Sequence, residues 1–119
     1  MQKIEAYQAI AVMAQNKGRL IVLLYDGAIK FMKLAIKELE VNNYEAKGRY
    51  INKALDIINE LDVMLNMNAG GEMASNLRKL YRFMTKHLSE ADIKCDPQMI
   101  RDVIKLMEEL NQSWKAISG

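Results

Sequence analysis

Residues 20–41, LIVLLYDGAIKFMKLAIKELEV, decide the fold because their apolar and charged positions repeat with the period of an α-helix. At 100° per residue all the charged side chains except Glu38 share one narrow stripe, which consists of Asp26, Lys30, Lys33, Lys37 and Glu40. Apolar residues cover roughly two-thirds of the circumference, whereas a surface helix needs an apolar arc of only about 100° to dock on a core. Something beyond the neighbouring helices of a bundle must cover the surplus, and its identity is the functional question.

The composition is that of one globular domain. The chain has 119 residues, of which 50% are hydrophobic and 27% charged, with a net charge of +2. This near-balance argues against a dedicated nucleic-acid binder, in which positive charge gathers on one face. The single cysteine, Cys95, cannot form an internal disulfide. The chain has neither an apolar run of membrane-span length nor the apolar stretch of a signal peptide, so we expect a cytoplasmic protein without membrane insertion.

Three further segments have the helical period, and they cover residues 44–67, 73–91 and 97–117. The glycines at 70 and 71 favour a turn, Asn42 or Asn43 can cap the second helix, and Asp96-Pro97 is a cap followed by a first-turn proline. Short connections make neighbouring helices antiparallel. We therefore predict an all-α, antiparallel up-down four-helix bundle over residues 18–119, preceded by an N-terminal cap segment over residues 1–17.

One glycine inside the first helix needs a reason. Glycine in a helix interior costs about 0.5–1 kcal/mol relative to alanine, so we expect another helix or segment to approach closely at Gly27.

The N-terminal segment repeats apolar residues at helical spacing, with Ile4, Tyr7, Ile10 and Ala11 on one face. A helix this short is only marginally stable in isolation, so it must pack on the bundle to be ordered. Two interpretations stay open. The segment is either a fixed helix that permanently covers surplus apolar surface, or a removable cover that competes with a partner for the same groove.

The sequence offers little for catalysis or metal binding. It has one histidine, His87, and Met84 stands where a di-iron bundle would need the Glu of a Glu-x-x-His motif. Cys95 has no neighbouring histidine and no second thiol. The paired glycines lack the lysine and hydroxyl residue of a phosphate loop. We therefore expect a protein that is not an enzyme and needs no cofactor or metal ion.

Several apolar residues stand beside the expected core lines. Tyr50, Ile57 and Met64 form a stripe at spacing seven, and Phe83 and Leu106 are placed similarly on the later helices. Each alone is typical of a core edge, since scattered exposed apolar residues are normal. Together with the first helix they indicate grooves that can receive amphipathic helices from another chain.

Several blocks of the chain resemble the FliS family of flagellin export chaperones, and they appear in family order along nearly the whole chain. They are Ala6-Tyr7, Leu20–Phe31 with its Leu-Tyr-Asp-Gly core, Lys53–Leu61, Gly70–Leu77, Leu80–Met84, Glu90–Lys94 and Ser113–Lys115. One stretch departs from the family pattern, because Ala14-Gln15-Asn16-Lys17 replaces a Thr-Ala-Ser-Pro-like cap.

The resemblance implies a cytoplasmic chaperone that binds the disordered C-terminal region of flagellin. It implies that the bound region gains helices on the bundle, cannot polymerise prematurely and stays competent for flagellar type III export. It also implies that the N-terminal segment is a displaceable cap. Other flagellar export or regulatory proteins are further candidate partners, and we expect a monomer or weak dimer.

The expected partner-binding residues fall into two groups. Ile4, Tyr7 and Ile10 form the cap, and the client surface consists of Leu24, Tyr25, Ile29, Met32, Ile57, Met64 and Phe83. The assignment rests on apolar residues away from the core lines. Of the two flanks of the first helix, we favour the Tyr25–Met32–Ile36 side over the Leu23–Leu34 side.

Two other functions compete with this hypothesis. A helical scaffold or oligomerisation module would bury the same apolar surface between copies. A nucleic-acid-binding bundle would use Lys30, Lys33 and Lys37 against phosphates, although Asp26 and Glu40 dilute that charge.

Overall fold

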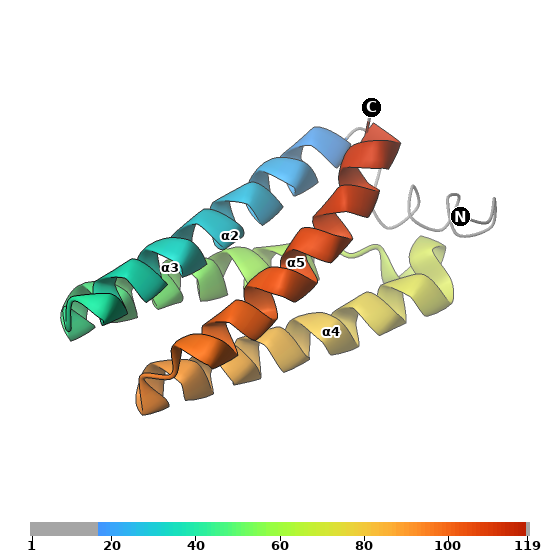
Figure 1. Cartoon of the computed structure of the whole chain (residues 1–119). Coiled ribbons are helices and arrows are strands. Elements are labelled where there is room, and N and C mark those ends of the chain that lie inside the picture. The colour runs from blue at the N-terminus through green and yellow to red at the C-terminus, as the bar shows by residue number, and fades with distance from the viewer. Residues whose placement is uncertain (1–16, 119) are drawn as a thin grey trace.

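The computed structural model describes residues 17–118 and consists of four α-helices in this range (Figure 1). The helices are α2 (Gly18–Glu40), α3 (Tyr44–Val63), α4 (Met67–Lys94) and α5 (Pro97–Ser118). Helix α2 packs on α3 and α5, and α4 packs on the same two helices, so α2 and α4 lie diagonally across the core. The predicted four-helix bundle is confirmed. None of these helices is long and apolar enough to cross a membrane.

Side chains cap three of the helices, two of them at the predicted positions. The Asn43 side chain accepts a hydrogen bond from the Ala46 amide at 3.3 Å, at the start of α3. Asp96 accepts one from the Gln98 amide at 2.9 Å, directly before the proline that opens α5. Asn66 caps α4 in the same way. Each cap satisfies an amide that the first helical turn leaves without a partner.

The boundary between α3 and α4 differs from the prediction. Helix α3 ends at Val63 rather than near residue 67, and a new helical turn begins at Met67 under the Asn66 cap. The predicted break at the glycine pair occurs within α4, where Gly71 has φ 55° and ψ −130°. Only glycine adopts that conformation readily. The chain therefore makes one extra turn before the long straight part of α4.

Two tyrosines face each other in the core from diagonal helices. Tyr25 of α2 is 0% exposed and Tyr81 of α4 is 2% exposed, and their hydroxyl oxygens lie 2.6 Å apart. The Trp114 ring of α5 lies 6.3 Å from the Tyr25 ring. Burial raises the pKa of Tyr25 to about 12 and that of Tyr81 well above its usual range. Both hydroxyls are thus neutral at physiological pH and hydrogen-bond within the core.

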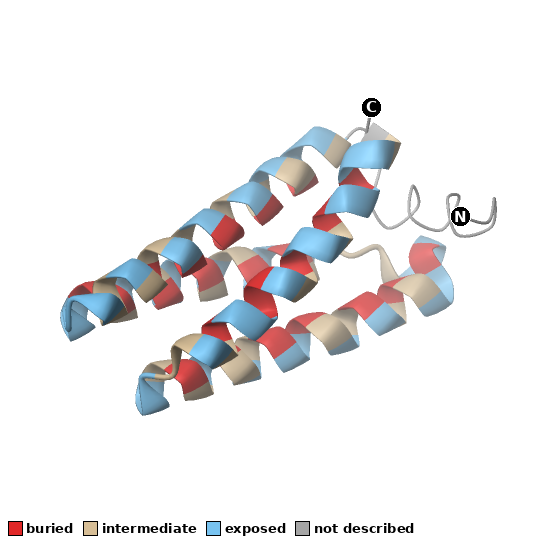
Figure 2. Ribbon diagram, in the orientation of Figure 1, coloured by how far each residue is buried: buried red, intermediate tan, exposed pale blue. Residues whose placement is uncertain are grey.

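Helices display their buried residues toward the centre of the bundle, and Figure 2 shows buried and exposed residues alternating along each of them with the helical period. The charged stripe predicted on α2 is exposed along its length. It consists of Asp26, Lys30, Lys33, Lys37 and Glu40.

Replacing Tyr81 with Phe should destabilise the fold by about 1–3 kcal/mol, because the Tyr25 hydroxyl would lose its partner in the core. The double variant Tyr25→Phe/Tyr81→Phe should be no less stable than Tyr81→Phe, since it leaves no orphaned hydroxyl at the pair. Chemical denaturation of the three proteins measures both differences. Additive losses in the double variant would show that the hydroxyl pair does not act as a unit.

Candidate functional site

Three consecutive residues of α2 point toward three different helices. Tyr25 hydrogen-bonds Tyr81 of α4. The Asp26 carboxylate accepts a hydrogen bond from the Asn111 amide group of α5 at 2.8 Å and lies 3.4 Å from the Lys115 ammonium group. At Gly27 an added Cβ would stand 3.4 Å from the Cδ1 atom of Ile57 in α3. A methyl group there would make only ordinary van der Waals contact with Ile57, so α3 lies against Gly27 but its approach does not require a glycine.

These contacts fix the rotation of α2 about its axis and decide which apolar flank faces outward. Leu23 is 66% exposed and Leu20 is 46% exposed, near the start of the helix. Leu24 and Leu34 are half-buried on the same side. The surplus apolar surface of the sequence is therefore the Leu23–Leu34 flank.

This flank continues onto α3 along the line where the two helices meet. The Phe31 and Tyr50 rings stack with centroids 6.1 Å apart, and the Lys53 ammonium group lies 5.5 Å from the Phe31 centroid. Ile57 meets Gly27, and the antiparallel register then places Met64 level with Leu20. We call this strip the α2/α3 seam, and it comprises Leu20, Leu23, Leu24, Phe31, Tyr50, Ile57 and Met64.

The α3 side of the seam is partly exposed. The Tyr50, Ile57 and Met64 side chains are half-buried, so each is held in place and still presents apolar surface. The geometry suits an amphipathic segment that lies along the seam, with its apolar side against the stripe.

Three of the predicted client-surface residues are buried within the bundle. Tyr25 and Met32 are fully buried and Ile29 is 9% exposed, so all three belong to the core. The favoured Tyr25–Met32–Ile36 flank faces the interior because the Tyr25 hydroxyl needs its buried partner. Both flanks of α2 are apolar in the sequence, so their hydropathy could not decide between them.

The other predicted residues divide between two places. Leu24, Ile57 and Met64 lie together in the seam. Phe83 lies apart from them, with its ring stacked on His87 at a centroid distance of 5.0 Å, at the edge between α4 and α5. The predicted cap residues Ile4, Tyr7 and Ile10 lie outside the described residues.

The exposed seam residues that the prediction missed are Leu20 and Leu23. Their signal was present in the sequence, since both stand on the apolar arc away from the buried line of α2. The Phe31–Tyr50 stack was not foreseen either, because it depends on the register between α2 and α3.

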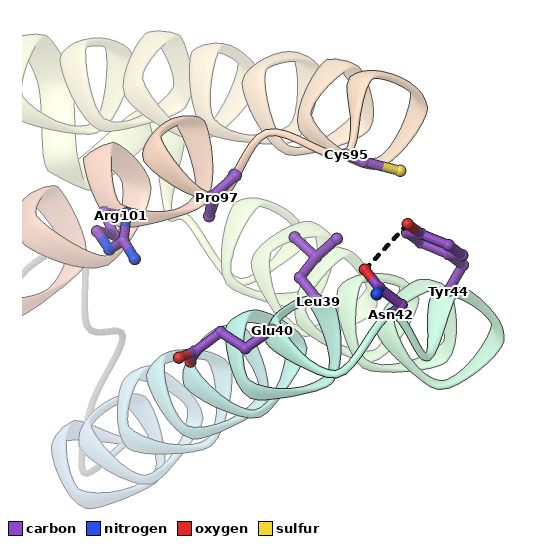
Figure 3. Close-up of a pocket in the computed structure, with 7 residues that line it drawn as sticks. All are labelled: Leu39, Glu40, Asn42, Tyr44, Cys95, Pro97 and Arg101. Atoms are coloured by element: carbon purple, nitrogen blue, oxygen red, sulfur yellow. Dashed lines mark hydrogen bonds between the residues drawn. The ribbon is translucent and has the colours of Figure 1, made fainter.

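A small pocket of about 200 Å³ lies at the end of the bundle where the α2–α3 and α4–α5 turns meet (Figure 3). It is lined by Leu39, Glu40, Asn42, Tyr44, Cys95, Pro97 and Arg101. The Tyr44 hydroxyl donates to Asn42 at 3.1 Å, and the Cys95 thiol is exposed at the rim. No histidine lines this pocket to activate the thiol. Within the described range, no three His, Cys, Asp or Glu side chains are placed to hold a metal ion.

Comparison with known proteins gives one consistent family. A family model described as "Flagellar protein FliS" matches residues 1–119. A Salmonella typhimurium protein named "Flagellar secretion chaperone FliS" is 38% identical over 120 residues, which cover 97% of this chain and 89% of the relative. Its Vibrio cholerae counterpart is 35% identical over 118 residues, 96% of this chain and 87% of that protein. The Bacillus subtilis counterpart is 34% identical over 110 residues, 92% of this chain and 81% of that protein.

Substitutions at Gly27 should separate helix propensity from helix approach. Gly27→Ala should be neutral or stabilise the fold by up to about 1 kcal/mol, because a methyl group fits against Ile57 and alanine favours the helix. Gly27→Leu should destabilise it by about 1–3 kcal/mol, because a larger side chain pushes α3 away. Thermal or chemical unfolding measures both. Equal stability of the Ala and Leu variants would contradict a close approach at this position.

Proposed function

The chain belongs to the FliS family of flagellar proteins, and we propose that this flagellar secretion chaperone has flagellin as its client. The observation that carries the proposal is the α2/α3 seam, which leaves Leu20 and Leu23 exposed on a helix whose rotation is fixed. A monomeric bundle has no use for this surface in its own core. An amphipathic segment of another chain would bury it.

The proposed client segment is the C-terminal region of flagellin, bound as a helix along the seam. Leu24, Ile57 and Met64 form the half-buried floor on which its apolar side chains would pack, and Leu23 forms a rim. Folding on binding costs ordering entropy, which keeps such a complex releasable despite a large contact area. Covering this region would prevent premature polymerisation and leave the client ready for type III export in the cytoplasm.

We further propose that the N-terminal segment covers the seam until a client displaces it. Helix α2 begins at Gly18, so the segment joins the bundle beside the end of the seam at which Leu20 and Met64 lie. Tethering this close gives Ile4, Tyr7 and Ile10 a high effective concentration at the seam. The short segment can therefore protect apolar surface in the free protein and still yield to a longer client.

Acidic substitutions in the seam should weaken binding of a flagellin C-terminal peptide. Leu23→Asp and Met64→Asp should each raise the Kd about tenfold or more, because they place a charge in an apolar contact. Isothermal titration or fluorescence anisotropy gives the Kd. The matched control is Ile93→Asp, which makes the same change at a residue of α4 that is 83% exposed and lies outside the seam.

The control should bind as the unmodified protein does, and circular dichroism should show all three variants folded. Unchanged affinity in the folded seam variants would remove these residues from the client site. If no flagellin peptide binds and the mass of the protein rises with its concentration, the surface would belong to a self-interface instead.

Deleting residues 1–14 should leave the bundle folded and leave the affinity for the flagellin peptide equal or higher, because a competitor for the seam has been removed. The same titration on full-length and shortened protein measures the difference. A marked loss of affinity would instead show that the segment contributes to the client-binding site.

A further inference from the structure

We propose that the outward face of α4 is a second docking surface, which binds a short acidic amphipathic helix of a partner protein. This basic–aromatic face consists of Lys79, Arg82, Phe83 and Lys86, all of them exposed. It lies outside the seam, on a helix that packs on α3 and α5, so the inference does not depend on the client proposed above.

The three cations of this face are not neutralised by the bundle. None of the ion pairs formed within residues 17–118 involves Lys79, Arg82 or Lys86. Other basic residues of α4 do have carboxylate partners, since Arg78 lies 3.0 Å from Asp62 and Lys94 lies 3.9 Å from Glu90. The charge of the basic–aromatic face is therefore available to a partner.

Phe83 adds an ordered apolar contact beside these charges. It is 50% exposed, and its ring lies nearly parallel to the His87 ring, at an interplanar angle of 24°. His87 in turn lies 3.2 Å from the Asp102 carboxylate of α5. The phenyl ring is thus supported from behind and offers its other face to a partner.

The spacing of the cations indicates where the acidic residues of the partner helix should stand. Lys79 and Lys86 are one heptad apart, which places them about 10 Å from each other along the helix axis. Carboxylates one heptad apart on a facing helix would match them, with an apolar side chain between the carboxylates resting on Phe83.

A nucleic acid fits this face less well. Glu72 and Glu90 stand on the same side of α4 beyond each end of the lysine pair, so a phosphate backbone would meet negative charge on both sides. Three cations are also fewer than the phosphate contacts of typical binders. A short acidic helix fits between the two glutamates.

The test uses the full chain and a synthetic helical peptide with two Glu residues seven positions apart and a Leu between them. The charge-reversal variant Lys79→Glu/Lys86→Glu should raise the Kd at least tenfold, and Phe83→Ala should raise it several-fold. Lys30→Glu/Lys37→Glu is the matched control, because it reverses two exposed lysines one heptad apart on α2. It should change the Kd less than twofold.

A second peptide of opposite charge controls for loss of folding in the charge-reversal variant. A peptide with Lys in place of both Glu should bind the charge-reversal variant more tightly than it binds the unmodified chain, which also shows that the variant folds. Equal losses in both lysine variants would reduce the binding to net charge and overturn the proposal. The proposal also fails if a single-stranded DNA oligonucleotide binds the unmodified chain more tightly than the Glu peptide and loses affinity in the α4 variant.

Discussion

The hydrogen bond between the Tyr25 and Tyr81 hydroxyls is the constraint on which the surface of this bundle depends. A buried hydroxyl without a partner is costly, so α2 and α4 must keep one rotation and one axial offset that let the oxygens meet. With Tyr25 turned inward, Asp26 reaches α5 and Gly27 meets α3. The Leu23 side of the helix must then face outward. The exposed apolar seam is therefore a consequence of a polar contact in the core.

Much of this fold could be predicted from the sequence, because charged stripes, caps and glycine breaks act locally. The lysine stripe of α2 and the Asn43 and Asp96 caps are examples. Which flank of α2 faces the core could not be read in the same way. Hydropathy is nearly symmetric about the helix, and the deciding partner, Tyr81, lies 56 residues further along the chain.

The periodicity of the sequence likewise could not predict contacts between segments that lie far apart in the chain. Lys47 is buried, and its ammonium group donates to the Asp92 backbone carbonyl at 2.9 Å while pairing with the Asp92 carboxylate. The contact closes one end of the bundle by satisfying a carbonyl at the end of α4. Nothing in the sequence around Lys47 predicts this contact. Phe83 was identified as apolar and off the core line, but its support by His87 depends on α5 and on the neighbouring turn of α4.

The stretch Tyr25-Asp26-Gly27 matters when this chain is compared with its relatives. Tyr25 and Asp26 hydrogen-bond two different helices and Gly27 lies against a third, so the packing of the bundle alone gives these positions a role. Two members of the family with unrelated cargo could share all three and diverge only at the seam. Leu-Tyr-Asp-Gly then reports how the bundle is built, and under the client site proposed above, differences in cargo would be sought at residues such as Leu23 and Met64.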